Sequence, residues 1–327
     1  MATFTVVKLS FQSPLHIGLG RDYYDFSAKE LHSDTLTSAL ASVRAMNGKT
    51  ENLEEFLSSF TISSAFPFCK GQYFLPKPVG RLPISVVGKE EQAYRKQLKG
   101  LNFLEAELWK QLMTGHQIEV EEGQLQGEFL TANPDDFSLP YKHQVTQRAR
   151  VPREGGMDVE MFFFDWTFFQ KESGFYCLLD APNECIEEIK NLFVQLGEWG
   201  LGSSRSVGGG KFEVTFDTLT IDTAVDADGV VLLSTFVPTP EEHQSIDWQQ
   251  SRYSLIKRDG FISGSNQTNL RHLWKRSVYM VNVGSLLCTS KTIQGKVMDL
   301  RPKETGMEQM HAVYRSGRGL CIPIKMW

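Results

Sequence analysis

The spacing of apolar residues changes along this chain and predicts where helices and strands lie. Residues 1–11 alternate apolar and polar side chains, as in a half-buried strand. Residues 183–197 carry apolar side chains at helical spacing, and Gly197 is a stop signal. Residues 212–221 alternate again, so we expect a strand after this helix.

Two further elements complete a recognisable unit. A helix is predicted to begin at residues 32–34, with Ser33 or Asp34 as its N-cap, and to close at Asn47. A strand is predicted over residues 174–180. Together these elements predict the order β-α-β-β-α-β of a ferredoxin-like domain that is split by insertions.

The first predicted domain covers residues 1–221. Residues 49–140 form a large irregular insertion with a helical stretch at 90–113.

Residues 144–169 are predicted to form a long hairpin that turns at 154–156. Its first arm carries three arginines: Arg148, Arg150 and Arg153. A weakly buried hairpin cannot offset its own ordering entropy, so we expect it to dock on another molecule.

Residues 222–327 form the second predicted domain, which is mostly β. Its strand candidates are residues 230–236, 254–261, 277–288, 295–300 and 320–324. The predicted fold class is therefore α+β, with two ferredoxin-like domains, the second of them modified.

A glycine-rich loop, residues 200–211, joins the second helix of the first domain to its last strand. Dinucleotide and P-loop sites need strand, loop and then helix, so this order excludes both. Glycines would let a phosphodiester chain lie against backbone N–H groups, with cations as counter-charges; a flexible surface loop is the alternative. The residues predicted to make these contacts are Arg205, Ser206, Gly208, Gly209, Gly210 and Lys211.

Charge is segregated along the chain, although the net charge is only −5. Residues 212–251 hold eight acids and no Lys or Arg, whereas residues 252–325 hold thirteen Lys or Arg and four acids. This pattern predicts a basic surface for a polyanion and an acidic surface for a protein neighbour; two solvated faces are the plain alternative.

The remaining composition limits the classes of function. The five cysteines are scattered and form no C-x-x-C pair, which favours a reducing cytoplasm over a disulfide framework. The sequence predicts no signal peptide and no membrane span. It offers no metal-ligand cluster and no cofactor motif, so we expect neither a metal nor a cofactor.

Several segments resemble those of the RAMP superfamily of CRISPR proteins, and most closely the subunits that hold the crRNA 5′ end in type III-A (Csm) effector complexes. These segments are Pro14-Leu15-His16-Ile17-Gly18, His32-Ser33-Asp34-Thr35-Leu36, the glycine-rich loop, Tyr253 to Phe261, Gly284-Ser285, and His311 to Gly317. A proline often follows the histidine of the last segment, where this chain has Ala312.

The resemblance implies a non-catalytic, RNA-binding subunit that grips the repeat-derived 5′ tag of crRNA. It implies contacts with the large polymerase-type subunit and with the backbone RAMP subunit. The hairpin at 144–169 would be a thumb that presses on the guide–target duplex, where base pairing supplies sequence specificity. Further candidate RNA contacts are His16, Gly18, Arg258 and Arg315; candidate stacking rings are Tyr23, Tyr24 and Tyr314.

Several alternatives stay open. His16 is as readily a structural residue, and Arg258 and Arg315 could pair with acids of this chain instead of RNA. Ser33 or Asp34 is better explained as a helix cap than as part of a nucleophilic triad. The alternative functions are a metal-independent endoribonuclease that processes pre-crRNA, the equivalent subunit of a type III-B complex, and a subunit that contacts only proteins.

Overall fold

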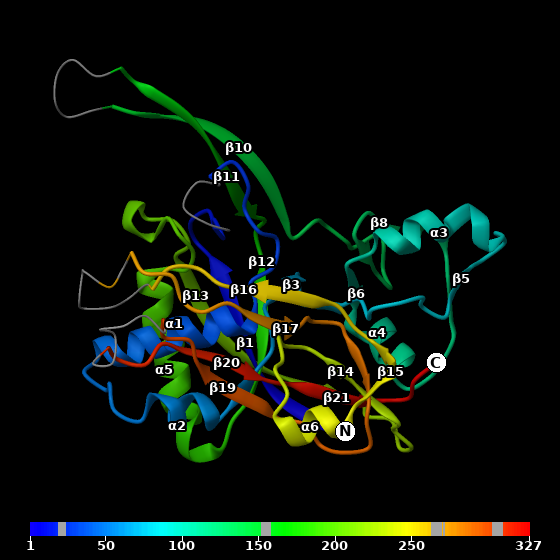
Figure 1. The fold of residues 1–327 in the computed structure, drawn as a ribbon. Coiled ribbons are helices and arrows are strands. Elements are labelled where there is room, and N and C mark those ends of the chain that lie inside the picture. The colour runs from blue at the N-terminus through cyan, green and yellow to red at the C-terminus, as the bar shows by residue number, and fades with distance from the viewer. Residues whose placement is uncertain (19–23, 152–157, 263–269, 271, 303–309) are drawn as a thin grey trace.

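The computed structural model describes residues 1–327 except 19–23, 152–157, 263–269, 271 and 303–309. Its largest sheet begins with four antiparallel strands in the order β13-β1-β12-β3 (Figure 1). These strands are β13 (Phe212–Ile221), β1 (Ala2–Phe11), β12 (Ser173–Asp180) and β3 (Phe66–Cys69). The predicted strands at 1–11, 174–180 and 212–221 are therefore confirmed.

Helices α1 (Ser33–Met46) and α5 (Asn183–Trp199) lie next to each other, and α5 also packs against β13. Both predicted helices are confirmed, with two local corrections. The N-cap of α1 is His32, and Ser33 and Asp34 lie inside the helix. Gly197 does not end α5: a Cβ there would come 2.3 Å from the Phe212 carbonyl oxygen, so glycine allows helix and strand to approach.

The insertion extends the sheet. After β3 the strand order continues through β4 (Gln72–Pro76), β6 (Phe103–Glu105), β9 (Phe129–Leu130) and β8 (Leu125–Gln126), while β2 (Thr61–Ile62) pairs with β12. The predicted helix at 90–113 is two helices separated by β6, namely α3 (Glu91–Gly100) and α4 (Ala106–Met113). The other elements here are α2 (Leu53–Ser58), β5 (Ile84–Val86), β7 (Ile118–Val120) and the 3-10 helix η1 (Glu122–Gln124).

The predicted hairpin is confirmed and begins slightly earlier than expected. β10 (Tyr141–Arg150) pairs with β11 (Glu160–Phe169) in continuous antiparallel register, and the hairpin projects from the body of the molecule (Figure 1). We call it the thumb hairpin. It is attached by an antiparallel bridge between Leu15 and Thr167.

The second half is strand-rich, as predicted. Its four-stranded sheet has the order β15 (Asp247–Arg252), β18 (Leu286–Cys288), β14 (Gly229–Leu232) and β21 (Cys321–Ile324). Two further pairs are β16 (Leu255–Arg258) with β17 (Val278–Val281), and β19 (Gly295–Asp299) with β20 (Tyr314–Arg318). In the described part of residues 222–327 the only α-helix is α6 (Pro240–Ser245).

The two halves share one hydrophobic core. Val231, Leu286 and Ile322 from the second half belong to the same buried cluster as Val6 and Leu36 from the first. In addition, β20 packs against α1, and both β19 and β20 pack against α2. The halves therefore stabilise each other, because apolar area of each is removed from water by the other.

Candidate nucleic-acid interface

The glycine-rich loop is held by its own backbone amides. Four of them donate to oxygens of this chain: Gly208 to Arg205 (3.0 Å), Gly209 to Ser204 (3.1 Å), Gly210 to Pro14 (2.8 Å) and Lys211 to the Ser13 hydroxyl (2.8 Å). The expectation that these N–H groups bind phosphate is therefore wrong, because each already has an acceptor.

Two glycines of this loop region allow neighbouring segments of backbone to approach each other closely. Gly210 has φ +71°, and a Cβ there would come 1.9 Å from the Leu201 carbonyl oxygen. Gly202 has φ +89°, and a Cβ there would come 2.2 Å from the His16 carbonyl oxygen. Both positions exclude a side chain by conformation and by contact, so the glycine content keeps the loop compact.

The outer side of the loop is exposed and basic. Arg205, Ser206, Gly208 and Lys211 all lie in solvent, next to Val207, which is 67% exposed. The amides of residues 204–206, where the 3-10 helix η2 (Arg205–Val207) begins, donate to no acceptor among the described residues. The loop therefore presents two cationic side chains and a hydroxyl outward from a rigid base.

The base of the thumb hairpin supports this loop. A Cβ on Gly209 would come 2.9 Å from the Trp166 ring, so the indole lies directly against the loop backbone. Trp166 contacts Phe164 at 4.6 Å between ring centroids, and Phe164 contacts His16 at 4.3 Å. Trp166 was not among the predicted site residues, although residues 160–169 are rich in aromatic side chains, which is the signal that could have identified it.

His16 belongs to this support. The residue is 2% exposed, and its Nδ1 lies 2.7 Å from the Asp165 carbonyl oxygen. Of the two roles left open by the sequence, the structural one is correct, since a buried ring cannot reach RNA. Gly18 is exposed, and a Cβ there would come 3.1 Å from the Ser203 hydroxyl. It therefore lies beside the glycine-rich loop.

The two faces of the thumb hairpin differ in chemistry. On one face the Arg148 guanidinium stacks over Phe164 and Trp166, 4.8 and 5.0 Å from the ring centroids. The opposite face exposes apolar side chains: Val145 (55%), Met161 (55%) and Phe163 (54%). Arg150 lies in β10 opposite Glu160, and Arg153 lies outside the described residues. A rigid cationic face and an apolar face thus project together from the body.

Arg258 and Arg315 point into the protein instead. The Arg258 Nε donates to Asp34 Oδ2 at 2.9 Å, and the Arg315 guanidinium donates to the same oxygen. Asp34 is fully buried, and Arg315 is 6% exposed. Burial lowers the pKa of Arg315 to about 10. Both arginines therefore pair with an acid of this chain. The prediction that they contact RNA is corrected.

This cluster joins the two halves. It consists of His32, Asp34, Arg258 and Arg315, and we call it the Asp34 cluster. Burial, followed by the two arginines, lowers the pKa of His32 to about 3. The neighbouring Ser33 hydroxyl bonds Thr235 of the second half at 3.0 Å. The His-Ser-Asp segment is thus an interface between halves, with no nucleophilic triad.

The candidate stacking rings have different surroundings. Tyr24 is 38% exposed and packs edge-on against Phe162 of the thumb hairpin, at 5.9 Å between ring centroids. Tyr314 lies partly buried in β20 and packs against the main core. Tyr23 lies outside the described residues. Tyr24 is therefore the candidate that remains near the thumb.

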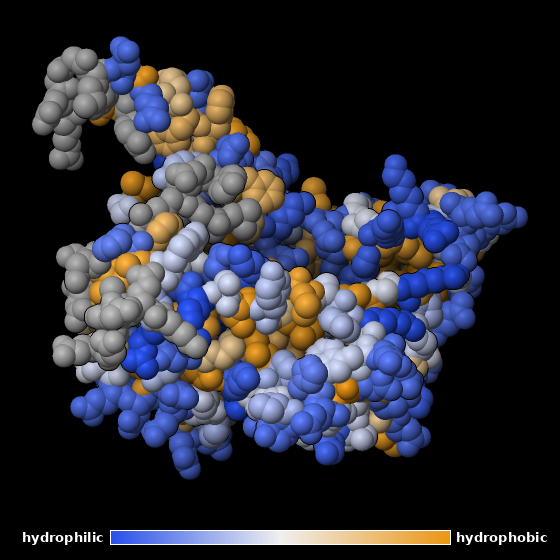
Figure 2. All heavy atoms as spheres, in the orientation of Figure 1, coloured by the Kyte–Doolittle hydropathy of each residue, from blue (hydrophilic) through white to orange (hydrophobic). Residues whose placement is uncertain are grey.

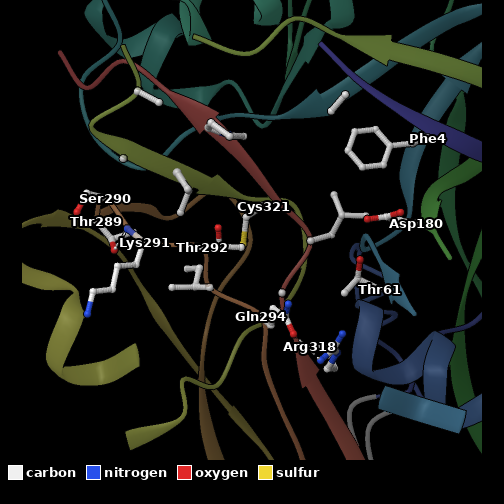
Figure 3. Close-up of a pocket in the computed structure, with 18 of the residues that line it drawn as sticks. Phe4, Thr61, Asp180, Thr289, Ser290, Lys291, Thr292, Gln294, Arg318 and Cys321 are labelled. Atoms are coloured by element: carbon white, nitrogen blue, oxygen red, sulfur yellow. Dashed lines mark hydrogen bonds between the residues drawn. The ribbon is translucent and has the colours of Figure 1, made fainter. Parts of the chain in front are cut away.

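A cavity of about 570 Å³ lies between the N-terminal end of β1 and the second half. Lys291 and Arg318 enter it from one half, while Asp180 and Thr61 line it from the other (Figure 3). In Figure 1 the N-terminal end of β1, which lines the cavity through Ala2 and Thr3, lies at the end of the molecule opposite the thumb hairpin. Among the described residues no three His, Cys, Asp or Glu side chains form a metal-binding group. No described helix has the length and apolar character needed to cross a membrane.

The C-terminal part of the chain is similar to a known protein family. Residues 225–324 match the family model of the CRISPR Csm4 C-terminal domain. Over its whole length the chain is similar to the CRISPR system Cms protein Csm4 of Streptococcus thermophilus, with 28% identity over 342 residues that cover 99% of this chain and 100% of that protein. The Csm4 protein of Thermococcus onnurineus is 23% identical and is matched over 88% of this chain and 90% of its own.

Solved structures show the same fold. A chain from the crystal structure of a Csm1–Csm4 cassette in complex with cA4 superposes with a TM-score of 0.62 at 20% identity, covering 99% of both chains. A chain from a Csm3–Csm4 subcomplex of the type III-A CRISPR-Cas interference complex gives a TM-score of 0.60 at 17% identity, covering 99% of this chain and 100% of that chain. The family resemblance predicted from the sequence is confirmed.

Proposed function

We propose that this chain, a full-length relative of the Csm4 proteins, is a non-catalytic, RNA-binding subunit of a type III-A CRISPR effector complex. In this role it holds the repeat-derived 5′ tag of crRNA and takes part in antiviral defence in the cytoplasm. The observation that carries the proposal is the exposed pair Arg205 and Lys211, presented by a loop that rests on the thumb hairpin.

Support for RNA binding comes from the rigidity of this site. The glycine-rich loop uses its amides internally, so Arg205 and Lys211 project from a fixed backbone. Charge-assisted contacts to phosphate fix the register of RNA without reading its sequence. The cationic face of the thumb hairpin, with Arg148 stacked on two aromatic rings, would lie against the guide–target duplex.

We also infer the domain architecture and the partners. The strand order β13-β1-β12-β3 with α1 and α5 supports a ferredoxin-like domain over residues 1–221. A second, modified domain of the same kind would cover residues 222–327. By analogy with the Csm1–Csm4 and Csm3–Csm4 structures, the partners are the large subunit and the backbone RAMP subunit.

The absence of catalysis is inferred from the burial of two histidines in the segments that resemble the family, His16 and His32. Metal-free RNA cleavage needs an accessible acid and base at the 2′-OH. His16 is 2% exposed and bonded to a backbone carbonyl, and His32 is 6% exposed within the Asp34 cluster. Incubation of 5′-labelled repeat RNA with the full chain should leave it intact; a cut at the repeat–tag boundary would assign the processing nuclease instead.

The RNA site is tested with the double variant Arg205→Ala/Lys211→Ala of the full chain. Binding of labelled tag RNA should weaken for all sequences, and the slope of log affinity against log salt should fall by about 1.4, since each phosphate contact on a single strand contributes about 0.7. The matched control is Arg95→Ala/Lys96→Ala, which removes two exposed cations from α3 in the insertion. Equal effects of the two double variants would contradict a site at the loop.

A further inference from the structure

The strand pair β16–β17 exposes an unusual set of large side chains, and we call it the β16–β17 ribbon. The exposed fractions are 65% for Tyr279 and 58% for Leu255 within the pair, and 51% for Trp274 and 40% for Tyr253 beside it. Figure 2 shows hydrophobic and intermediate residues over the area where Figure 1 draws these strands. Exposed aromatic and apolar side chains gathered around one strand pair are a candidate interaction site.

Two of these rings are already fixed in place. Trp274 stacks on Phe261 with ring centroids 4.4 Å apart and planes inclined by 11°. Tyr253 is held edge-on by Trp248 at 5.1 Å between ring centroids. A planar ligand that stacked on Trp274 would therefore cost little side-chain entropy, because the ring is already ordered.

The register places a cation next to a third ring. Lys257 lies directly opposite Tyr279 in the antiparallel pair, so both side chains are on the same face. The Lys257 side chain is 52% exposed and forms an ion pair with Asp259 at 3.2 Å. Apart from Arg258, which pairs with Asp34, residues 252–262 and 272–282 hold four Lys or Arg and one acid.

This composition favours nucleic acid over protein as the occupant. Aromatic rings interleaved with cations are the usual platform for single-stranded nucleic acid, where bases stack and phosphates meet the charges. The cores of protein–protein interfaces are depleted in lysine. The excess of cations around the rings therefore indicates a polyanion with flat bases.

The ribbon is also connected to the proposed RNA site. Arg258 of β16 bonds Asp34 and Thr35 at the start of α1. The chain just before this helix contacts the thumb hairpin, because the Ser27 amide donates to Asp165 Oδ2 at 2.9 Å. In Figure 1 the ribbon crosses the front of the molecule below the thumb hairpin.

We propose that the β16–β17 ribbon is a stacking platform for single-stranded RNA, with Trp274 and Tyr279 contacting bases and Lys257 contacting a phosphate. This inference rests on the proposed function and names the aromatic partners of the same RNA. The RNA that leaves the glycine-rich loop and the thumb hairpin would continue across the ribbon as an unpaired strand.

The test measures binding of the full chain to a fluorescent, unpaired RNA of about 12 nucleotides, within the range that such platforms cover. Trp274→Ala and Tyr279→Ala should each weaken binding by about tenfold, as expected for loss of one base–ring stack. The salt slope should not change, because stacking releases no counterions, whereas Lys257→Ala should lower it by about 0.7.

Two controls separate stacking from misfolding. Trp274→Phe and Tyr279→Phe keep an aromatic face and should retain most of the affinity, provided that circular dichroism shows folded protein. Phe216→Ala removes a ring that is 39% exposed on β13, outside the ribbon, and should have no effect on binding. RNA that contains 2-aminopurine should show quenching that Trp274→Ala abolishes.

The outcomes distinguish this inference from the proposed function. If Arg205→Ala/Lys211→Ala weakens binding and the ribbon variants do not, the glycine-rich loop stands and the platform is wrong. If only the ribbon variants weaken binding, the platform stands and the loop is not the site. Unchanged RNA affinity, with loss of association with the large subunit, would make the ribbon a protein interface and overturn the inference.

Discussion

The glycine-rich loop and the Asp34 cluster use cations in opposite ways. At the loop, Arg205 and Lys211 lie in solvent, and the amides of residues 208–211 donate to oxygens of this chain. In the Asp34 cluster, two arginines of the basic C-terminal third lie inside the molecule and donate to one buried carboxylate. The first arrangement leaves charge available to a ligand, and the second neutralises it within the fold.

The difference shows that a basic sequence is not by itself a basic surface. An arginine that enters a core needs a compensating charge, because an unpaired buried ion is costly. Asp34 provides that charge from the other half of the chain. Cations that reach solvent need no such partner, and they are therefore the ones that can bind phosphate.

The largest effect on stability is expected from the substitution Asp34→Asn. It leaves Arg258 and Arg315 without a counter-charge in the interior, so the free energy of unfolding should fall by about 3 kcal/mol or more. Chemical denaturation of the full chain measures this change. Asp217→Asn is the control, because it removes a surface ion pair with Lys8 in which the Asp217 side chain is 51% exposed, and it should cost less than about 1 kcal/mol.

An equal loss of stability for the two aspartate variants would contradict the role of the Asp34 cluster. RNA affinity provides a second readout. Folded Asp34→Asn protein should keep the salt slope of the unmodified chain, because its buried arginines make no phosphate contact. A lower slope would return Arg258 or Arg315 to the RNA site.

The glycine-rich loop is tested by two alanine substitutions with similar backbone geometry. Gly208 and Gly210 both have positive φ, +83° and +71°, but a Cβ on Gly208 meets nothing within 4 Å. Gly208→Ala should therefore cost about 1 kcal/mol from the left-handed conformation alone, and Gly210→Ala about 2 kcal/mol or more, because its Cβ meets a carbonyl oxygen.

Denaturation curves of both variants measure this difference. If the loop is a packed turn, RNA affinity should also fall more for Gly210→Ala than for Gly208→Ala, since the backbone that presents Arg205 and Lys211 must shift. If the two variants lost equal stability, the loop would be an open cradle instead of a packed turn.

The spacing of apolar residues was sufficient to predict a helix or strand where that element buries one face. The helix at 183–197 and the strand at 212–221 were predicted because their apolar residues follow one period. Two polar strands were missed, β15 and β20. β15 is an edge strand whose residues are exposed or half-buried, so it lacks the apolar alternation of a half-buried strand. β20 is buried at Arg315, Ser316 and Gly317, and because these residues are not apolar, no apolar pattern marks the strand.

The candidate site was only partly predictable for a related reason. Composition identified Arg205 and Lys211 on a loop between a helix and a strand, and both are exposed. It could not show that Arg315 lies against Asp34, 281 positions away, because that contact depends on how the halves pack. Nor could it show that Trp166 supports Gly209, which required the position of the thumb hairpin.

The smallest expected effect concerns the charge state of the Asp34 cluster. His32 has a pKa of about 3 in the folded chain, against 6.5 when unperturbed, because burial and the nearby arginines disfavour its charged form. As pH falls below 6.5 the unfolded chain takes up a proton that the folded chain does not. His32 should therefore cause stability to fall as pH decreases, with a slope that approaches about 1.4 kcal/mol per pH unit about one unit below that value.

Urea denaturation of the full chain at pH values from about 6.5 down to about 5 measures this slope. Burial raises the pKa of the neighbouring Glu30 from 4.5, so its proton uptake in the folded chain opposes the effect of His32 as pH falls. His32→Asn removes the titrating ring. The slope of the unfolding free energy against pH should therefore decrease by the contribution of about one proton. If the slope survived in His32→Asn, the proton would belong to another histidine, and the ring beside the buried arginines would not carry the pH dependence.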